Sequence, residues 1–442
     1  MFQGYDFSQG TERMHHVSAS LIRAYSNRAA ELQAEGKQVI RFSAGEPNFN
    51  TPSDIKEAAI RAITNNYTHY PSNKGYGPLE DEISRYTEEF AGVHYDPDTE
   101  ILVTSSAAEA LNNAMLTFVG PGDEVIVPMP AFVTYKALAG LCGATLVPLY
   151  LEEKSGFQLD PDALEKVITP RTKMLVLNNP CNPTGAVLSY ETLAKVCQLA
   201  QKYNFLILSD EIYSRMVYGN SKFYSVASFP GMKERAIIVN GFSKTFAMTG
   251  WRMGYLCLQA DLLPVLLRCH QYSTTCSPAF IQVALAEAMD SPLTRLQVQM
   301  MLDQLAKRRN LVMQELDGIP GLSYILPQGA FYIMVDVRGL GMTGSAFSQK
   351  LLEEKYVATV PAVGLDEPSD SYVRFSYAAS DEDLREGFRR IRWLRKSGTV
   401  NESDLKDKES TGCFEEEDDY DESRDFQLDS RGRHPIPERS AF

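Results

Sequence analysis

The chain has 442 residues and is 44% hydrophobic, so it can bury a large core and is long enough for two domains. Its net charge is −14; the segment from Ser397 to the C-terminus, with 14 acidic and 6 basic residues, carries −8 of it and the rest carries −6. The sequence has no basic stripe for nucleic acid and no run of 18 apolar residues for a membrane helix, which argues against both kinds of partner.

The cysteines and histidines indicate whether the protein has disulfides or a metal site. The seven cysteines are scattered without a CxxC pair, which argues against a disulfide framework and against a thiolate metal site. The six histidines show no metal-ligand spacing, so no metal is predicted. The polar stretch 1–16 has no apolar signal core. Together these features predict a cytoplasmic protein in a reducing compartment.

The predicted elements begin with a helix over 17–35, where apolar residues recur at helical spacing before Gly36. Short apolar runs after it predict strands at 101–103, 123–127, 145–149, 174–177, 205–209, 236–240 and 253–258. Helical segments such as 107–118, 159–168 and 190–203 fall between them. This alternation predicts an α/β fold with a mostly parallel, doubly wound sheet, whose ligands bind beyond the carboxyl ends of the strands.

The pattern changes after about residue 290. The predicted elements are then a helix at 296–316, a strand at 331–337, a helix at 345–354, strands at 357–360 and 372–376, and a helix at 381–395. They indicate a second, smaller α+β domain. We therefore expect an N-terminal arm and helix at 1–45 that join the small domain, a large domain at 46–290, a small domain at 291–397 and a disordered acidic tail at 398–442.

One glycine motif has the form of a dinucleotide-binding fingerprint. The sequence GLGMTG at 339–344 matches G-x-G-x-x-G, follows a predicted strand and precedes a predicted helix, as a dinucleotide fingerprint should. It lies far down the chain, however, and the strand after its helix does not end in an acidic residue placed for a ribose. We therefore interpret it as a turn and a helix cap, not as a nicotinamide site.

The most informative stretch is VNGFSKTFAMTGWRMGYL at 239–256. Its lysine, Lys244, follows a buried strand, where a charged amine costs desolvation unless it has a partner or a function. A desolvated amine loses its proton more easily, and a neutral amine attacks carbonyl groups. Ser243 and Arg252 add a hydroxyl and a bidentate cation, the groups that hold a phosphate. These residues predict covalently bound pyridoxal phosphate, although Lys244 by itself also fits an exposed lysine at a strand end.

Two further positions follow predicted strands. Small residues at 105–108 let the backbone N–H groups of Ala107 and Ala108 approach an anion at a helix N-terminus, although small residues also cap many helices. Asp210 ends the strand at 205–209, where its carboxylate can stabilise a protonated pyridine nitrogen. The alternative for Asp210 is a helix N-cap.

Three side chains complete the predicted site. The two Asn-Pro steps of NNPCNPTG (178–185) form either an ordinary loop or one that holds Asn182 toward a ring hydroxyl. Phe132 can stack on a planar ring or belong to the core. Arg374 alternates out of the apolar strand 372–376, where it suits the carboxylate of an amino acid substrate or a surface salt bridge.

Several motifs occur in a fixed order: SAGEPNF (43–49), Tyr70 to Gly75, GDEVIVP, NPTG, SDEIY, SKTFAMTGWRMGY and YVRFSYA (372–378). With them the chain resembles, over about residues 15–395, the class I/II pyridoxal-phosphate aminotransferases of fold type I, in the aspartate/aromatic group. The resemblance implies a large cofactor-binding domain with a smaller domain beside it. It also implies a ping-pong transfer of an amino group between an L-amino acid and a 2-oxo acid.

The resemblance assigns a role to each candidate residue. Lys244, Asp210 and Tyr213 are the catalytic set, with Lys244 forming the internal aldimine. At the cofactor ring, Asp210 binds the nitrogen, Tyr213 and Asn182 bind the oxygen, and Phe132 stacks on the face. The phosphate is held by Ser243, Arg252, Ala107 and Ala108. Tyr70 reaches the cofactor from the second subunit of a homodimer. The substrate carboxylate is bound by Gly45, Asn182 and Arg374. The Asn182–Pro183 peptide is cis in this family.

The chain also departs from the family pattern. Asn48 replaces a common aspartate, Cys181 lies within the NPTG loop, and VPAVG (360–364) replaces the frequent VPGxxFG. Ala108 stands where some aspartate-preferring relatives have a lysine. The side-chain carboxylate of an aspartate donor would need a cation when it is buried, so the alanine favours neutral or aromatic amino donors. The alternatives are β-elimination, cyclisation of an S-adenosylmethionine-type substrate and, more remotely, an idle relative that binds partners through its acidic tail.

Overall fold

The computed structural model describes residues 10–396 of the chain. The acidic tail expected at 398–442 lies outside the described residues, as does the start of the N-terminal arm.

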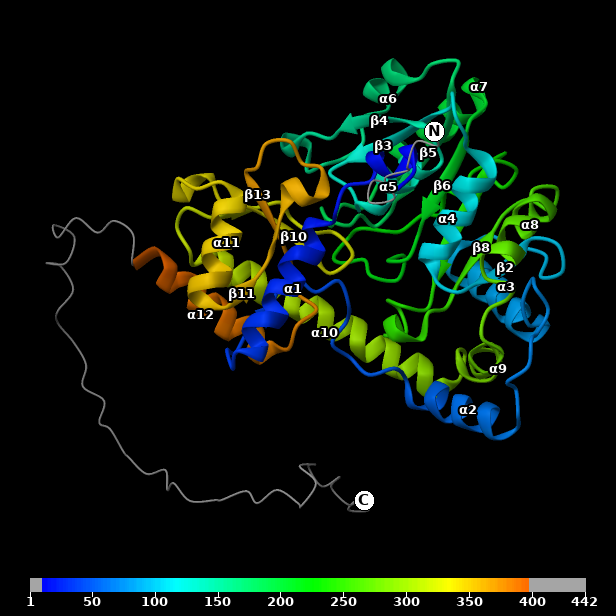
Figure 1. The fold of residues 1–442 in the computed structure, drawn as a ribbon, viewed down its shortest axis with the longest axis horizontal. Helices are drawn as coiled ribbons and strands as arrows, with labels where there is room; N and C mark the ends of the chain where they lie inside the picture. The colour runs from blue at the N-terminus through cyan, green and yellow to red at the C-terminus, as the bar shows by residue number, and fades with distance from the viewer. Residues whose placement is uncertain (1–9, 397–442) are drawn as a thin grey trace, which may run out of the picture. The chain divides into compact units, whose positions relative to one another are not determined.

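A seven-stranded sheet lies at the centre of the larger half of the described chain (Figure 1). Its order is β2-β8-β7-β6-β5-β3-β4. The strands are β2 (Ile101–Thr104), β3 (Glu124–Met129), β4 (Thr145–Tyr150), β5 (Thr172–Asn178), β6 (Leu206–Asp210), β7 (Ala236–Gly241) and β8 (Gly254–Cys257). Neighbours from β7 to β4 are parallel, and β8 runs antiparallel to both β7 and β2. The predicted α/β fold with a mostly parallel sheet is confirmed.

Helices cover both faces of this sheet, which explains why its strands are apolar throughout. Alternate residues of one strand face opposite sides, so Ile126 joins the core on one face while Val125 and Val127 join the core on the other. One face carries α2 (Ser53–Thr64), α3 (Gly77–Ala91), α6 (Pro161–Val167), α7 (Tyr190–Tyr203) and α9 (Ala279–Ala288). The other face carries α4 (Ala107–Phe118), α5 (Thr134–Leu141) and α8 (Leu263–Ser273).

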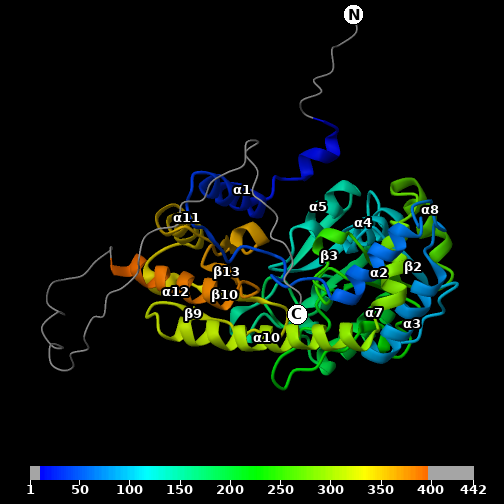
Figure 2. The ribbon, with the colours of Figure 1, turned by 90° about the horizontal axis from the view of Figure 1, so that it is seen from below.

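The remaining strands form two small sheets. An antiparallel sheet of order β12-β13-β10-β9 contains β9 (Ser323–Tyr324), β10 (Tyr332–Asp336), β12 (Val360–Pro361) and β13 (Tyr372–Ser376). A parallel pair joins β1 (Ile40–Arg41) to β11 (Val357–Ala358). Residues of β10 and β13 share a hydrophobic core with α10 (Pro292–Asp317), α11 (Gly344–Lys355) and α12 (Asp381–Lys396). Figure 2 shows α10 extending from this group toward α2, which it contacts.

The structure refines two element predictions and confirms a third. The strand expected at 357–360 is two strands, because Val357–Ala358 pairs with β1 whereas Val360–Pro361 pairs with β13. The helix expected at 17–35 is α1 (Leu21–Ala34), since the Ser20 hydroxyl accepts the Arg23 amide (3.4 Å) and caps it there. The GLGMTG motif forms a turn with Gly341 at φ +68° and a cap in which the Thr343 hydroxyl accepts the Ala346 amide, as expected.

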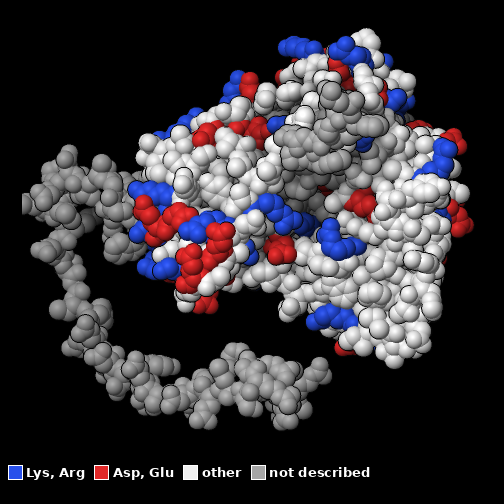
Figure 3. Space-filling model, in the orientation of Figure 1, with Lys and Arg blue, Asp and Glu red and all other residues white. Residues whose placement is uncertain are grey.

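Basic and acidic side chains lie next to each other on the face drawn in Figure 3 and do not form separate fields. Ion pairs on the surface of the described chain include Arg28 with Glu353 and Arg338 with Asp336. Within residues 10–396, no helix is both long and apolar enough to cross a membrane.

Candidate active site

Lys244 lies in the loop that follows β7, directly after the buried Ser243. Its half-buried side chain donates a hydrogen bond from Nζ to the Gly45 carbonyl oxygen at 2.5 Å. Burial lowers the pKa of this amine to about 8, while the carboxylates of Glu46 and Asp210 act in the opposite direction. An appreciable fraction of the amine is therefore neutral near pH 7, which is the nucleophilic form.

Asp210 ends β6 and is only 5% exposed. Its Oδ2 accepts the Tyr135 hydroxyl at 2.7 Å, and its Oδ1 accepts the Ile212 amide at 3.2 Å. Burial raises the pKa of this carboxyl to about 6, and the two hydrogen bonds partly oppose the rise. Phe132 packs edge-on against the Tyr135 ring, with 5.8 Å between centroids. The arrangement holds one buried carboxyl in a fixed orientation near Lys244.

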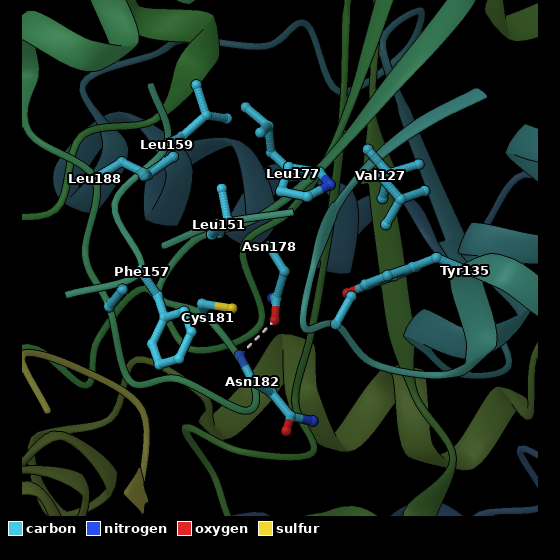
Figure 4. A pocket seen from close by; sticks show the side chains of 14 residues that line it. Val127, Tyr135, Leu151, Phe157, Leu159, Leu177, Asn178, Cys181, Asn182 and Leu188 are labelled. Atoms are coloured by element: carbon cyan, nitrogen blue, oxygen red, sulfur yellow. Dashed lines mark hydrogen bonds between the residues drawn. The ribbon is translucent and has the colours of Figure 1, made fainter. Parts of the chain in front are cut away.

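The loop after β5 carries Asn182 beside a small cavity. The Asn182 amide donates to the side chain of Asn178 at 2.7 Å, and the Asn182–Pro183 peptide is cis, as the resemblance implied. Figure 4 shows Asn178, Asn182 and Tyr135 at the edge of a cavity of about 30 Å³ whose far wall is apolar. Cys181 lines it as well, and burial raises the pKa of its thiol.

Arg374, on β13, is a buried cation with part of its hydrogen-bonding capacity unused. It is 2% exposed; its Nη1 donates to Asn182 Oδ1 at 2.9 Å and its Nη2 to the Ser43 carbonyl oxygen at 3.0 Å. Its Nε has no partner, and within residues 10–396 no carboxylate forms an ion pair with the guanidinium. Burial lowers its pKa. A buried, unpaired guanidinium is suited to an anionic ligand.

Tyr332, at the start of β10, was not predicted from the sequence. Its hydroxyl lies 3.1 Å from the hydroxyl of Tyr213, and the Arg374 guanidinium lies 4.4 Å from its ring centroid. It therefore joins the predicted ring-oxygen residue to the predicted carboxylate residue. A hydroxyl-bearing aromatic at the start of the apolar strand 331–337 was the signal available in the sequence. Tyr135 was likewise missed, although it ends the PAFVTY motif.

The opposite end of the site is formed by the N-terminus of α4. Within the described chain, the amides of Ala107 and Ala108 have no hydrogen-bond acceptor. Arg252 is exposed, and its Nη1 donates to the Thr249 carbonyl oxygen at 2.9 Å. Gly254, two residues after Arg252, lies so close to α4 that an added Cβ would come within 2.4 Å of the Ala107 nitrogen. The chain just after Arg252 therefore packs against the turn that carries the free amides, and amides together with a guanidinium suit an anion.

Tyr70 is a predicted site residue that the structure leaves apart from the others. Its side chain is 87% exposed, and within residues 10–396 it makes no hydrogen bond. Hydrogen bonds link Lys244 to Gly45 and Arg374 to Asn182, both predicted pairs, and Asp210 to the unpredicted Tyr135.

Comparison with known proteins identifies the family. The family model described as aminotransferase class I and II matches residues 37–391, so the chain belongs to this family. It is 38% identical to an aspartate aminotransferase of Pyrococcus abyssi, over 86% of this chain and 97% of the relative. It is 36% identical to aromatic-amino-acid aminotransferase 2 of Thermococcus litoralis, over 87% of this chain and 98% of the relative.

Comparison with solved structures leads to the same family. The aspartate aminotransferase of Thermus thermophilus with maleate superposes with a TM-score of 0.82 at 34% identity, covering 87% of this chain and 99% of that one. The protein is accordingly a pyridoxal-phosphate-dependent aminotransferase of fold type I.

The residues present suit this cofactor chemically. Lys244 offers an amine of lowered pKa to an aldehyde, and Asp210 offers a buried carboxyl to a ring nitrogen. The amides of Ala107 and Ala108, which lack acceptors within the described residues, suit a phosphate. The unsatisfied Nε of Arg374 suits the carboxylate of an amino acid.

Proposed function

We propose that Lys244, Asp210 and Tyr213 are the catalytic residues of this aminotransferase and that Arg374, Asn182 and Gly45 bind the substrate. The half-buried Lys244 amine, with a pKa lowered to about 8 and one hydrogen bond to Gly45, carries this proposal. The cofactor would be held by Asp210, Tyr213, Asn182, Phe132, Ser243, Arg252, Ala107 and Ala108, and by Tyr70 of a second subunit.

Each residue has a task that its surroundings support. Pyridoxal phosphate, when bound, supplies a carbonyl carbon for the amino group and a ring that accepts electrons from the substrate Cα. Lys244, in its neutral form, takes the proton from that Cα and returns one. Asp210 holds a proton at the ring nitrogen. Arg374 binds the α-carboxylate and so fixes the direction of the Cα–H bond.

We propose a neutral or aromatic L-amino acid as the amino donor and a 2-oxo acid as the acceptor. Ala108 supplies no cation for a distal carboxylate, and the buried Arg374 is engaged by the α-carboxylate. The relatives are named for aspartate and for aromatic amino acids, so these are the donors to compare.

We also propose a homodimer that acts in the cytoplasm. The exposed Tyr70 is free to reach the site of a second copy, and large apolar side chains such as Tyr272 (87% exposed) and Met300 (62%) suit an interface. The six cysteines of the described chain are free thiols, in keeping with a reducing compartment. Within each subunit we retain the proposed division into a large domain at 46–290 and a small domain at 291–397.

The test is a spectrum of the cofactor-loaded protein during addition of single amino acids. The visible band of the cofactor should fall with phenylalanine or leucine and return when a 2-oxo acid is added. Aspartate should give a rate at least about tenfold lower, because its distal carboxylate lacks a cation. Equal rates with aspartate would contradict the proposed donor class.

Two other results would contradict the assignment of transamination. Release of a 2-oxo acid and ammonia without any acceptor would identify a β-lyase. A band that stays unchanged with every amino acid would identify an idle relative. For the dimer, a mixed species of one Tyr70→Phe and one Lys244→Ala subunit should keep one site free of both substitutions, because Tyr70 reaches the site of the other subunit. Two sites with one substitution each, and no site of wild-type activity, would contradict a role of Tyr70 across the interface.

A further inference from the structure

A buried pair of titratable residues, Glu109 and His270, lies beneath the N-terminus of α4 and has no role in the proposed chemistry. His270 is fully buried, and its Nδ1 lies 2.7 Å from Glu109 Oε1. The same oxygen accepts the side-chain amide of Asn113 at 2.9 Å. Glu109 Oε2 accepts the backbone amide of Ser105, the residue that precedes the helix cap. The pair thus links α8 to the turn that begins α4.

That turn is strained. Ser106, the N-cap of α4, has φ +106° and ψ 159°, a region that only glycine enters without cost. Such a conformation persists only when its surroundings hold it. On one side Gly254 contacts Ala107, and on the other the Glu109 amide donates to the Ser106 hydroxyl at 3.3 Å. The Glu109 carboxylate adds the bond to the Ser105 amide, one position earlier than a capping box would.

The strained turn has a consequence for anion binding. The amides of Ala107 and Ala108 are the first two of α4 and so have no acceptor within the helix. The hydroxyl of the N-cap Ser106 accepts the Glu109 amide instead of either, so both are left without acceptors within the described chain. They are therefore available to a ligand before it arrives. The contact with His270 orients the Glu109 carboxylate, and this carboxylate holds the turn through the Ser105 amide.

We infer that Glu109 and His270 are positioning residues that hold the Ser105–Ala108 turn ready for the cofactor phosphate. This inference rests on the proposed phosphate role of Ala107 and Ala108. The pair touches neither the substrate nor the reacting atoms. Its effect should therefore appear in the affinity for the phosphate and not in the affinity for the pyridine ring.

The experiment compares pyridoxal phosphate with pyridoxal, which lacks the phosphate, as ligands of the cofactor-free protein. In Glu109→Gln one of the two acceptor oxygens becomes an NH₂ donor, so the side chain can no longer accept from both the Ser105 N–H and the Asn113 amide, while the helix and the volume are kept. We expect the dissociation constant of pyridoxal phosphate to rise about tenfold, while that of pyridoxal changes less than about twofold. Glu191→Gln, in the first turn of the remote helix α7, is the matched control and should change neither.

A rescue distinguishes positioning from a general loss of structure. Glycine adopts φ +106° without strain, so Ser106→Gly combined with Glu109→Gln should recover most of the lost affinity for pyridoxal phosphate. A second route avoids Glu109: His270→Asn keeps a donor for the carboxylate and should bind normally, whereas His270→Leu should resemble Glu109→Gln.

Three outcomes would overturn the inference: an equal loss of affinity for pyridoxal and pyridoxal phosphate, no loss for either, or no recovery in the double variant. Failure of the wild-type protein to bind the phosphate end at all, seen as equal affinity for the two ligands, would instead contradict the phosphate role of Ala107 and Ala108. The two failures are therefore distinguishable.

Discussion

The proposed site has two ends, one for the substrate carboxylate and one for the cofactor phosphate, and they are built on different principles. At the carboxylate end, Arg374 is 2% exposed and bonded to Asn182 and Ser43, so its charge is fixed before any ligand arrives. At the phosphate end, the donors are backbone amides at a strained turn and the exposed Arg252. The first end is a rigid side-chain site within one chain, and the second relies on backbone geometry. Substitutions should therefore separate substrate binding from cofactor binding.

Lys244 lies between the two ends, and its substitution should have the largest effect on the transamination rate. Lys244→Met should lower the transamination rate about 10⁴-fold, because the proposed nucleophile and proton carrier is lost. The cofactor-free variant should also unfold at a higher temperature at pH 7, since methionine keeps the aliphatic stem without a desolvated charge. Single-turnover kinetics and thermal unfolding measure the two effects. A lower unfolding temperature would contradict the burial cost assigned to this amine.

The carboxylate end should respond to Arg374→Leu. We expect kcat/KM to fall about 10³-fold, because a fully buried charge-assisted contact is lost, while the affinity for pyridoxal phosphate stays within about twofold. Arg389→Leu, at a side chain 59% exposed on α12, is the matched control and should change neither. Loss of cofactor affinity in Arg374→Leu would mean that the two ends are not independent.

The phosphate end should respond to Arg252→Leu in the opposite way. The dissociation constant of pyridoxal phosphate should rise about 10- to 100-fold, the value of one charged hydrogen-bonding group, while kcat/KM at saturating cofactor changes less than about threefold. Titration of the cofactor-free protein followed by steady-state kinetics separates these quantities. A comparable loss of kcat/KM with saturating cofactor would contradict the assignment.

The lowered pKa of Lys244 predicts a pH dependence for the same amine. The initial rate at which the cofactor-free protein captures pyridoxal should rise about tenfold per pH unit below pH 8 and level off above it, because only the neutral amine reacts. Between pH 8 and 10.5 the unfolded chain holds a proton here that the folded chain has lost, so this residue's cost to stability falls as pH rises through that window. A midpoint near 10.5 would contradict the pKa.

The sequence predicted those parts of the site that local pattern determines. Lys244, Asp210 and Asn182 each follow an apolar strand, and parallel strands bring their carboxyl ends to one edge. Contacts between distant segments were not predictable in this way. Tyr213 and Tyr332 are 119 positions apart, and Glu109 and His270 are 161 apart, so no short motif contains either pair. The division of the strand at 357–360 depends in the same way on two separate partner strands.

Tyr332 offers the smallest and most specific test of the carboxylate end. Tyr332→Phe removes the hydroxyl that lies 3.1 Å from the Tyr213 hydroxyl but keeps the ring that faces the Arg374 guanidinium. Because one neutral hydrogen bond is lost, kcat/KM should fall only about two- to tenfold, with the cation–π contact preserved. Tyr332→Leu removes both contacts and should cost more.

The two variants also divide the effect between kcat and KM. If the hydroxyl acts by orienting Tyr213 at the cofactor ring, Tyr332→Phe changes kcat and the visible absorption of the bound cofactor, whereas the further loss in Tyr332→Leu appears in KM, through Arg374. A purely structural role would lower the unfolding temperature and leave both the spectrum and KM unchanged. Tyr332 would then stabilise the small sheet without linking Tyr213, at the cofactor ring, to Arg374, at the substrate carboxylate.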